Sequence, residues 1–241
     1  MTQVCVIFGA GEYYAGTPVV PAGAYVIAAD GGLDHTRQLG IVPDVVVGDF
    51  DSLEGRPPRT DVRTIALPAL KDDPDMLSAL KVGWSAGCRE FHVYGGLGGR
   101  IDHTISGIQL MALLARHGAS GYLYGDGLIV TAITDGRLSF PAHPVPEDGR
   151  MVSAFTNSDV SLGVNEPGLK YELKDGTLTN TVVQGVSNEF RDGVDAAISV
   201  EHGTLIVTFP IEVALPQVSR FHEFGGDIGE LDTAVSKLLV R

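Results

Sequence analysis

Acidic and glycine-rich clusters occur at four places in the first half of the chain, and each could take part in phosphate chemistry. They are Asp30-Gly31-Gly32, Gly48-Asp49-Phe50-Asp51-Ser52, Lys71-Asp72-Asp73-Pro74-Asp75 and Gly95-Gly96-Leu97-Gly98-Gly99-Arg100-Ile101-Asp102-His103. Each cluster follows a predicted strand or opens a predicted helix. Because such connections gather at one edge of a parallel sheet, we expect the four clusters to converge there.

Convergence would make the carboxylates repel one another unless a cation lies among them. Magnesium suits this role, since it takes one or two carboxylates together with waters and substrate phosphates. Asp49 and Asp51 are two residues apart in a turn, so both can face one ion. Glycines let backbone amides approach phosphate oxygens, and Lys71 and Arg100 add positive charge. The pattern predicts phosphoryl transfer, which depends on positioning and charge neutralisation.

Each cluster also has a purely structural alternative. Asp30 with its two glycines is typical of a turn, and Ser52 could cap a helix. Negative charge near a helix N-terminus is stabilising in itself, which offers another role for Asp73 and Asp102. For Asp73 we favour that role, as the N-cap, and His103 could simply cap or pack. The order and spacing of all four clusters carry more weight than any one of them.

The segments between the clusters predict an α/β fold. Short apolar runs rich in β-branched residues, typical of buried parallel strands, lie at residues 4–8, 25–29, 45–47, 62–67 and 91–94. Residues 74–86 and 102–117 place apolar side chains at helical spacing, the latter with Ile105, Ile108, Ala112 and Ala115. Strands that alternate with helices predict an open, mostly parallel sheet with helices on both faces.

The rhythm changes after a segment rich in proline and glycine. Residues 136–149 contain three prolines and predict a linker between an α/β domain, 1–138, and a second domain, 139–241. Apolar runs at 171–173, 178–183, 197–200 and 205–209, with hairpin turns at Asp175-Gly176 and His202-Gly203, predict a smaller all-β sandwich or barrel. Leu231, Val235, Leu238 and Leu239 predict a C-terminal helical tail.

Composition narrows the class of partner. The 241 residues carry a formal net charge of -13, which argues against nucleic acid and anionic lipid as partners. Cys5 and Cys88 lie in apolar segments and are expected to be buried free thiols in a reducing compartment. Because we find neither a signal-peptide pattern nor a continuous apolar run of about 18 residues, we expect a cytoplasmic protein.

The clusters, together with Pro43-Asp44, resemble the thiamine pyrophosphokinase (thiamine diphosphokinase) family in order and spacing. In the second half, Gly168-Leu169-Lys170-Tyr171 and Gly185-Val186-Ser187-Asn188 resemble that family's thiamine-binding domain. The resemblance covers roughly residues 25 to 209. It implies a nucleotide-binding α/β domain followed by a β-sandwich, and a homodimer whose active sites are shared between subunits. It also implies ATP as co-substrate, Mg²⁺ as cofactor and AMP as second product.

The resemblance also implies roles for individual residues. The implied magnesium ligands are Asp30, Asp49, Asp51 and Asp72. The implied nucleotide and diphosphate contacts are Gly31, Gly32, Lys71, Gly98, Gly99, Arg100 and Asp102, and the implied thiamine contacts are Tyr171, Ser187 and Asn188. Either Asp75 or Asp102 could accept the proton of the thiamine hydroxyl. Without the resemblance, Tyr171 could equally be a core aromatic, and Ser187 and Asn188 could be turn residues.

Two positions depart from the family pattern. Pro74 stands where the family usually has threonine, and Gly107 stands where it usually has asparagine. Each change removes a polar group from the edge of the predicted site. Two alternatives therefore stay open: a diphosphotransferase for another small alcohol, such as a hydroxymethyl-pterin, and a non-catalytic sensor of thiamine or nucleotide.

Overall fold

The computed structural model describes residues 3–14, 16, 18–49, 62–146 and 150–235. The chain divides into two compact units, Met1–Gly107 with Asp227–Arg241, and Ile108–Gly226. The division thus falls at residue 107, whereas the sequence predicted it at residue 138. The last residues group with the first unit, whereas the sequence placed them in the second domain. The reason lies in the strand at residues 128–140, which pairs with strands of the second half at residues 196–210 and 217–220.

The first unit contains a parallel sheet. Its strands are β1 (Gln3–Phe8), β2 (Tyr25–Ala29), β3 (Val45–Gly48), β4 (Arg63–Ala66) and β5 (Cys88–Tyr94). They lie in the order β5-β1-β2-β3-β4, and each neighbouring pair is parallel. The strands at the centre of this sheet are buried along most of their length, as runs without polar alternation predict. The predicted strands and their parallel pairing are confirmed, but β4, which was expected to be buried, is largely exposed.

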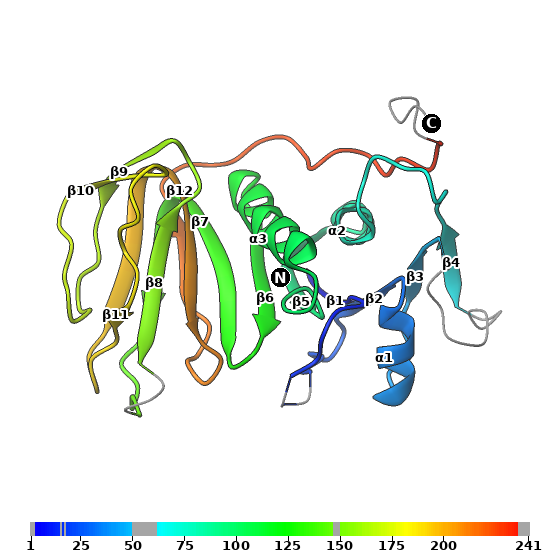
Figure 1. Ribbon diagram of the computed structural model, residues 1–241, viewed down its shortest axis with the longest axis horizontal. Coiled ribbons are helices and arrows are strands. Elements are labelled where there is room, and N and C mark those ends of the chain that lie inside the picture. Colours follow the sequence, from blue (N-terminus) through cyan, green and yellow to red (C-terminus); the bar gives the residue numbers. More distant parts are fainter. Residues whose placement is uncertain (1–2, 15, 17, 50–61, 147–149, 236–241) are drawn as a thin grey trace. The chain divides into compact units, whose positions relative to one another are not determined.

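Helices cover both faces of this sheet. The helix α1 (Gly32–Gln38) packs Leu33 against Ala28 and Val46 on one face. On the other face, α2 (Asp75–Ser85) lies so close that a Cβ atom at Gly83 would meet the Cys5 sulfur at 2.9 Å. Figure 1 shows α1 below these strands and α2 above them. The sequence did not predict α1, which has only seven residues.

The start of α2 differs from the prediction in detail. Pro74 is the N-cap, with no side-chain capping hydrogen bond, and the helix begins at Asp75. The predicted capping role of Asp73 is therefore wrong. Its carboxylate instead forms an ion pair with Lys81 Nζ at 2.5 Å. Pro74 itself has ψ of 151°, an extended conformation, so the helix begins one residue later than a cap at Asp73 would require.

The helix α3 (Ile101–Arg116) matches its predicted range within one residue at each end. Its first residues belong to the first unit and its last residues to the second. Ile105, expected on the apolar stripe, is 51% exposed, whereas Leu110, Met111 and Leu114 further along the helix are buried. The apolar stripe therefore serves burial mainly in the C-terminal part of the helix.

The second unit consists of antiparallel strands. They are β6 (Ser120–Gly125), β7 (Leu128–Phe140), β8 (Met151–Thr156), β9 (Val160–Val164), β10 (Gly176–Thr179), β11 (Asn188–Glu189), β12 (Ala196–Pro210) and β13 (Gln217–Arg220). The long strand β12 pairs with β7 along almost its whole length and also with β8 and β9. A cluster of buried side chains that includes Phe140, Phe190 and Phe209 lies in the core of this unit.

Several local predictions for this half are wrong. Residues 136–140, expected in the linker, continue β7, and residues 171–173 do not form a strand. His202-Gly203 does not form a hairpin turn, because β12 continues through it with a shift of register between Val200 and Thr204. Asp175-Gly176 precedes and begins β10 without joining two strands. The tail is not helical over residues 221–235, and the rest of the predicted helix lies outside the described residues.

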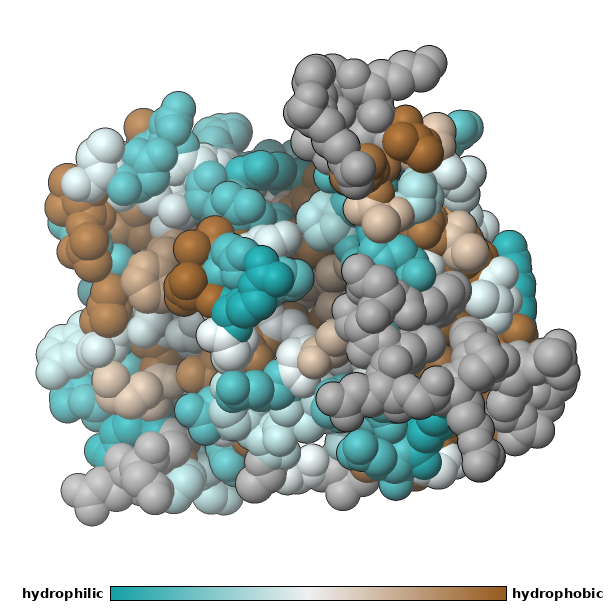
Figure 2. All heavy atoms as spheres, turned by 45° about the vertical axis from the view of Figure 1, so that its right-hand side comes forward, coloured by the Kyte–Doolittle hydropathy of each residue, from teal (hydrophilic) through white to brown (hydrophobic). Residues whose placement is uncertain are grey.

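The surface carries mixed side chains. Figure 2 shows one face on which hydrophobic residues lie in separate groups between hydrophilic ones. Cys5 and Cys88 are both buried and free, as predicted. Among the helices of the described residues, none has both the length and the apolar character needed to cross a membrane.

Candidate active site

The first unit contains a cavity of about 710 Å³. It is lined by the loops that follow β1, β2 and β5 and by the first turns of α2 and α3. The lining residues are Gly9, Ala10, Gly11, Glu12, Ala29, Asp30, His35, Pro74, Asp75, Met76, Gly95, Gly96, Gly98, Gly99, Arg100, His103, Ser106 and Gly107. Three of the four clusters singled out in the sequence therefore contribute side chains or backbone to one cavity at the carboxyl edge of the sheet.

Asp30 enters this cavity directly from the end of β2. Its backbone has φ of 47°, in the left-handed region, and its N–H donates to the Val47 carbonyl at 2.7 Å. Asp tolerates this conformation better than most side chains. The carboxylate oxygen Oδ1 is buried and has no hydrogen-bond partner among the described residues. A buried carboxylate oxygen without a partner costs free energy, which a bound cation or N–H donor would recover.

Lys71 links the second and third clusters. Its Nζ lies 3.5 Å from Asp49 Oδ2 and 3.2 Å from Asp75 Oδ1, and its side chain is only 9% exposed. Burial raises the pKa of Asp75; the Lys71 ammonium opposes this shift, and the charges of Asp30 and Asp49 add to it. These groups are therefore close enough to interact. Asp75 lines the cavity, whereas Lys71 and Asp49 are not among its lining residues.

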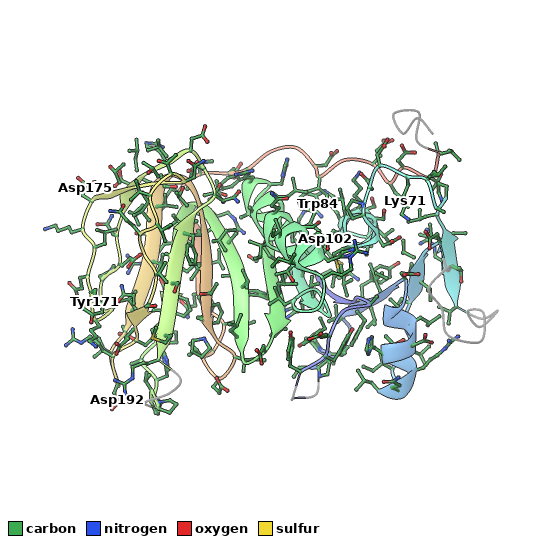
Figure 3. All side chains as sticks on the ribbon, in the orientation of Figure 1. Lys71, Trp84, Asp102, Tyr171, Asp175 and Asp192 are labelled. Atoms are coloured by element: carbon green, nitrogen blue, oxygen red, sulfur yellow. The ribbon has the colours of Figure 1, made fainter. Side chains whose placement is uncertain are left out.

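Arg100 and Asp102 form an exposed ion pair at the start of α3 (Figure 3). Arg100 Nε and Nη2 donate to the two oxygens of Asp102 at 3.1 and 2.5 Å. These hydrogen bonds lower the pKa of Asp102. Arg100 lines the cavity and Asp102 does not. In this arrangement the guanidinium fork is engaged by Asp102, so a phosphate would have to exchange for that carboxylate.

The glycines of the clusters serve two different purposes. Gly98 and Gly99 have φ of 79° and 61° and line the cavity, so this loop needs glycine for its backbone conformation. Gly31 and Gly32 do not line it. A Cβ atom at Gly32 would lie 1.9 Å from the Phe8 carbonyl oxygen. Glycine at position 32 is thus required for the close approach of α1 to β1, whatever its contact with a nucleotide.

The sequence analysis missed the loop that follows β1. Gly9 and Gly11 donate from their backbone N–H groups to the carbonyls of Tyr94 and Gly95 at 2.8 and 2.9 Å, which ties this loop to the one after β5. Glu12 at its end lines the same cavity. A glycine pair directly after the first predicted strand was the available signal. His35 was also missed; it lines the cavity and stacks on Tyr13 with ring centroids 3.8 Å apart.

Asp72 is exposed and does not line the cavity, and Asp51 lies outside the described residues. Across the described part of the chain, no group of three or more His, Cys, Asp or Glu side chains is arranged to hold a metal ion. Magnesium, however, needs only one or two carboxylates when phosphates and waters complete its shell. The unpartnered Oδ1 of Asp30 fits that requirement.

The second unit has its own cavity, of about 400 Å³. It is lined by Glu166, Tyr171, Glu172, Leu173, Thr177, Leu178, Gln184, Gly185, Val186, Ser187 and Asn188. All three residues predicted to contact thiamine are in this lining. Tyr171 lies on the long connection between β9 and β10 and is 60% exposed (Figure 3). Its ring therefore forms part of the cavity wall rather than part of the core.

Ser187 and Asn188 are held in place by the protein. Ser187 has φ of 61°, a strained value for a residue with a side chain, and its N–H donates to Ser153 Oγ at 3.0 Å. Asn188 is buried, and its amide hydrogen-bonds to Glu166 and to the backbone of Tyr171. The predicted contact of Asn188 with a substrate stays a prediction, but its side chain clearly organises this wall of the cavity.

The first unit therefore belongs to the class of open parallel α/β structures with a ligand cavity beyond the carboxyl ends of the strands. Residues 19–123 match the family model described as thiamin pyrophosphokinase, catalytic domain. Over these residues, the match confirms the resemblance to the thiamine pyrophosphokinase family that the motifs indicated.

Solved structures extend the likeness to most of the chain. The thiamine pyrophosphokinase from Bacillus subtilis superposes with a TM-score of 0.74 at 21% identity, over 88% of this chain and 100% of that chain. The enzyme from Geobacillus thermodenitrificans gives 0.71 at 21% identity over the same shares, and that from Candida albicans gives 0.68 at 12% identity over 88% and 90%. At such identities the likeness concerns the fold. No curated protein matches the chain by sequence.

Proposed function

We propose that the protein is a thiamine pyrophosphokinase that transfers the diphosphate of ATP to the hydroxyl of thiamine, giving thiamine diphosphate and AMP. The observation that carries the proposal is the cavity of the first unit, where Asp30 and Asp75 face glycine-rich backbone at the carboxyl edge of a parallel sheet. The family match over residues 19–123 supports the reaction class.

The reaction needs a nucleotide held by its phosphates. The thiamine hydroxyl oxygen forms a bond to the β-phosphorus, and the bond from that phosphorus to the oxygen bridging it to the α-phosphorus breaks, so AMP leaves with that oxygen. The loop around Gly98 lines the cavity and would bring its backbone close to phosphate oxygens, whereas the N–H groups of Gly9 and Gly11 already donate within the protein. Arg100 contributes positive charge once it exchanges Asp102 for phosphate.

Mg²⁺ fits the carboxylates of this cavity. Asp30 would hold it, with Asp49 held close to Asp75 through Lys71. When bound, the ion would neutralise charge on the phosphates. Lys71 keeps the carboxylates together when the nucleotide is absent, because its ammonium lies between Asp49 and Asp75.

The hydroxyl proton must be accepted by a nearby base. Of the two candidates from the sequence, Asp75 lines the cavity, whereas Asp102 is exposed outside it. The hydrogen bonds from Arg100 lower the pKa of Asp102 and make it a weaker base. We therefore assign proton acceptance to Asp75.

The test is product analysis with purified protein, ATP, MgCl₂ and thiamine. We expect AMP and thiamine diphosphate in equal amounts, and loss of turnover in Asp75→Asn and Asp30→Asn. Asp34→Asn is the matched control, since Asp34 lies on α1, outside the cavity, paired with Arg37 at 2.9 Å. Thermal melting of each variant separates loss of chemistry from loss of fold.

The alternatives give different products. If AMP forms with a hydroxymethyl-pterin but not with thiamine, the substrate is the pterin alcohol and not thiamine. ADP in place of AMP would overturn the reaction class. Tight binding of thiamine without AMP release would favour a sensor, the alternative that Pro74 and Gly107 suggest, both of which line the cavity.

We further propose the homodimer with shared active sites that the family resemblance implies. Mixing an Asp75→Asn protein with a Tyr171→Ala protein would test it. If each site combines the first unit of one subunit with the second unit of its partner, the mixture, assayed at thiamine well below the KM of Tyr171→Ala, shows more activity than the sum of the two variants assayed separately. No recovery in a mixture shown to contain heterodimers would overturn the shared site.

A further inference from the structure

Glu166 is a buried acid in the cavity of the second unit that no motif singled out. It is 4% exposed and lines the cavity of about 400 Å³. Its Oε2 accepts a hydrogen bond from Asn188 Nδ2 at 2.8 Å. Its Oε1 is buried and has no hydrogen-bond partner among the described residues. A buried carboxylate with one oxygen unpaired is costly, so its presence at a cavity wall points to a ligand that completes it.

The amide of the neighbouring Asn188 has no hydrogen-bonding position left for a ligand or for Glu166 Oε1. Its Nδ2 donates to Glu166 Oε2 and to the Tyr171 carbonyl at 2.8 Å each. Its Oδ1 accepts from the N–H groups of Tyr171 and Glu189 at 3.0 and 2.9 Å. Both donors and both acceptor positions of the amide are therefore used within the protein. This network also fixes the amide so that its NH₂ faces Glu166.

The charge of the cavity selects the kind of ligand. Its lining contains the acids Glu166 and Glu172 and, within the described residues, no lysine, arginine or histidine. Glu172 Oε1 accepts from the Gly168 N–H at 3.0 Å, which leaves Glu166 as the acid with an unused buried oxygen. Tyr171 supplies an aromatic face, which attracts cations and stacks on flat rings.

Burial raises the pKa of Glu166, and the hydrogen bond from Asn188 opposes that shift. The hydrogen bond from Asn188 therefore does not fully offset the free-energy cost of burying the ionised carboxylate. A positively charged ligand, or one that donates an N–H, would supply the missing stabilisation. Leu173 and Leu178 provide apolar surface beside it for the body of a ring.

We propose that Glu166 determines substrate specificity: its Oε1 accepts a hydrogen bond from the N–H of a positively charged, amino-substituted heteroaromatic substrate. This inference rests on the proposed function, because thiamine has both a cationic ring and an amino group on a flat ring. It goes beyond that function in assigning recognition of the amino group to a residue outside the family motifs.

The test is Glu166→Gln, which changes the acceptor into a donor. Because Asn188 Nδ2 already faces this residue, the glutamine carbonyl must accept from it, and the glutamine NH₂ must face the cavity. We expect kcat/KM for thiamine to fall about 10- to 100-fold, as for a lost hydrogen bond to a charged group, with KM for ATP unchanged. An analogue with a ring carbonyl in place of the amino group should lose far less or gain. Glu212→Gln, at an exposed position of the same unit, is the control.

Calorimetry with thiamine alone separates this inference from the proposed function. If the unaltered protein releases no AMP yet binds thiamine at least about tenfold more tightly than Glu166→Gln does, the inference stands and the proposed activity fails. If the unaltered protein turns over thiamine and Glu166→Gln shows the same kcat/KM and the same preference between the two ligands, the inference is overturned. If the unaltered protein does not bind thiamine, both are overturned.

Discussion

Replacement of Lys71 by methionine tests whether the acidic loops converge as the structure indicates. Lys71 Nζ lies 3.5 Å from Asp49 Oδ2 and 3.2 Å from Asp75 Oδ1. Methionine keeps an unbranched apolar side chain but removes the ammonium. The two carboxylates then face each other and Asp30 without a compensating charge. We therefore expect the folded state to be less stable and the arrangement of the cavity to be disturbed.

The magnitude follows from burial. Removing one partner of a fully buried ion pair costs about 3–5 kcal/mol. The side chains of Lys71, Asp49 and Asp75 are 9%, 14% and 31% exposed, so solvent screens part of the interaction at Asp75. We expect a loss of about 2–3 kcal/mol in the free energy of unfolding. For a chain of this size that corresponds to a fall in Tm of about 4–12 °C.

Thermal denaturation as a function of pH and of Mg²⁺ provides the assay. Burial already raises the pKa of Asp75 against the effect of Lys71, and without the lysine this pKa should rise further. Ionised Asp75 then destabilises the fold at neutral pH, and protonation relieves it. The difference in Tm between Lys71→Met and the unaltered protein should thus be largest near pH 8 and shrink as pH falls toward about 4. Mg²⁺ should raise Tm more in Lys71→Met than in the unaltered protein.

Two results would refute this reasoning. One is a Tm for Lys71→Met within about 1 °C of the unaltered protein near pH 8. The other is a difference in Tm that does not change with pH, which would mean that the carboxylates do not share the lysine. Lys174→Met is the matched control, because Lys174 is exposed in the second unit and its loss should leave Tm unchanged.

Three further predictions follow from single positions. Tyr171→Ala should raise KM for thiamine about tenfold with little change in KM for ATP, because Tyr171 lines the second cavity and not the first. Steady-state kinetics measure both constants, and equal increases in both would contradict this role. Gly32→Ala should destabilise the protein by about 1–3 kcal/mol, because its Cβ would lie 1.9 Å from the Phe8 carbonyl oxygen. Gly225→Ala is the control, since a Cβ there meets nothing within 4 Å. Denaturant unfolding gives the free energy of unfolding of both variants. Glu166→Gln should raise Tm near pH 8, because burial raises the pKa of Glu166 and its ionisation in the folded state costs free energy. This gain in Tm should vanish near pH 4, where the acid is protonated in both folded and unfolded chains. A gain that persists at low pH would contradict that explanation.

Much of the first unit could be predicted from local pattern. Consecutive apolar residues at Val4–Phe8 and Val45–Val47 can only be buried on both faces, which indicates parallel strands. The second half was harder, because its strands are short and their ends depend on pairing. The residues around His202 are typical of a turn. In the structure, however, β7 pairs with β12 both before and after His202, so β12 continues through this segment. Cross-strand hydrogen bonds outweighed the local preference there.

By itself, the sequence determined the parallel strands of the first unit, the helices α2 and α3, and the acidic and glycine-rich loops at the edge of the sheet, because local apolar pattern and turn chemistry dictate them. Only the tertiary structure decided which charges meet. It placed Lys71 between Asp49 and Asp75 and joined Glu166 to Asn188, 22 residues further along the chain. Hydrogen-bond partners and loss of solvent depend on residues brought together from distant segments, and no local pattern encodes that proximity.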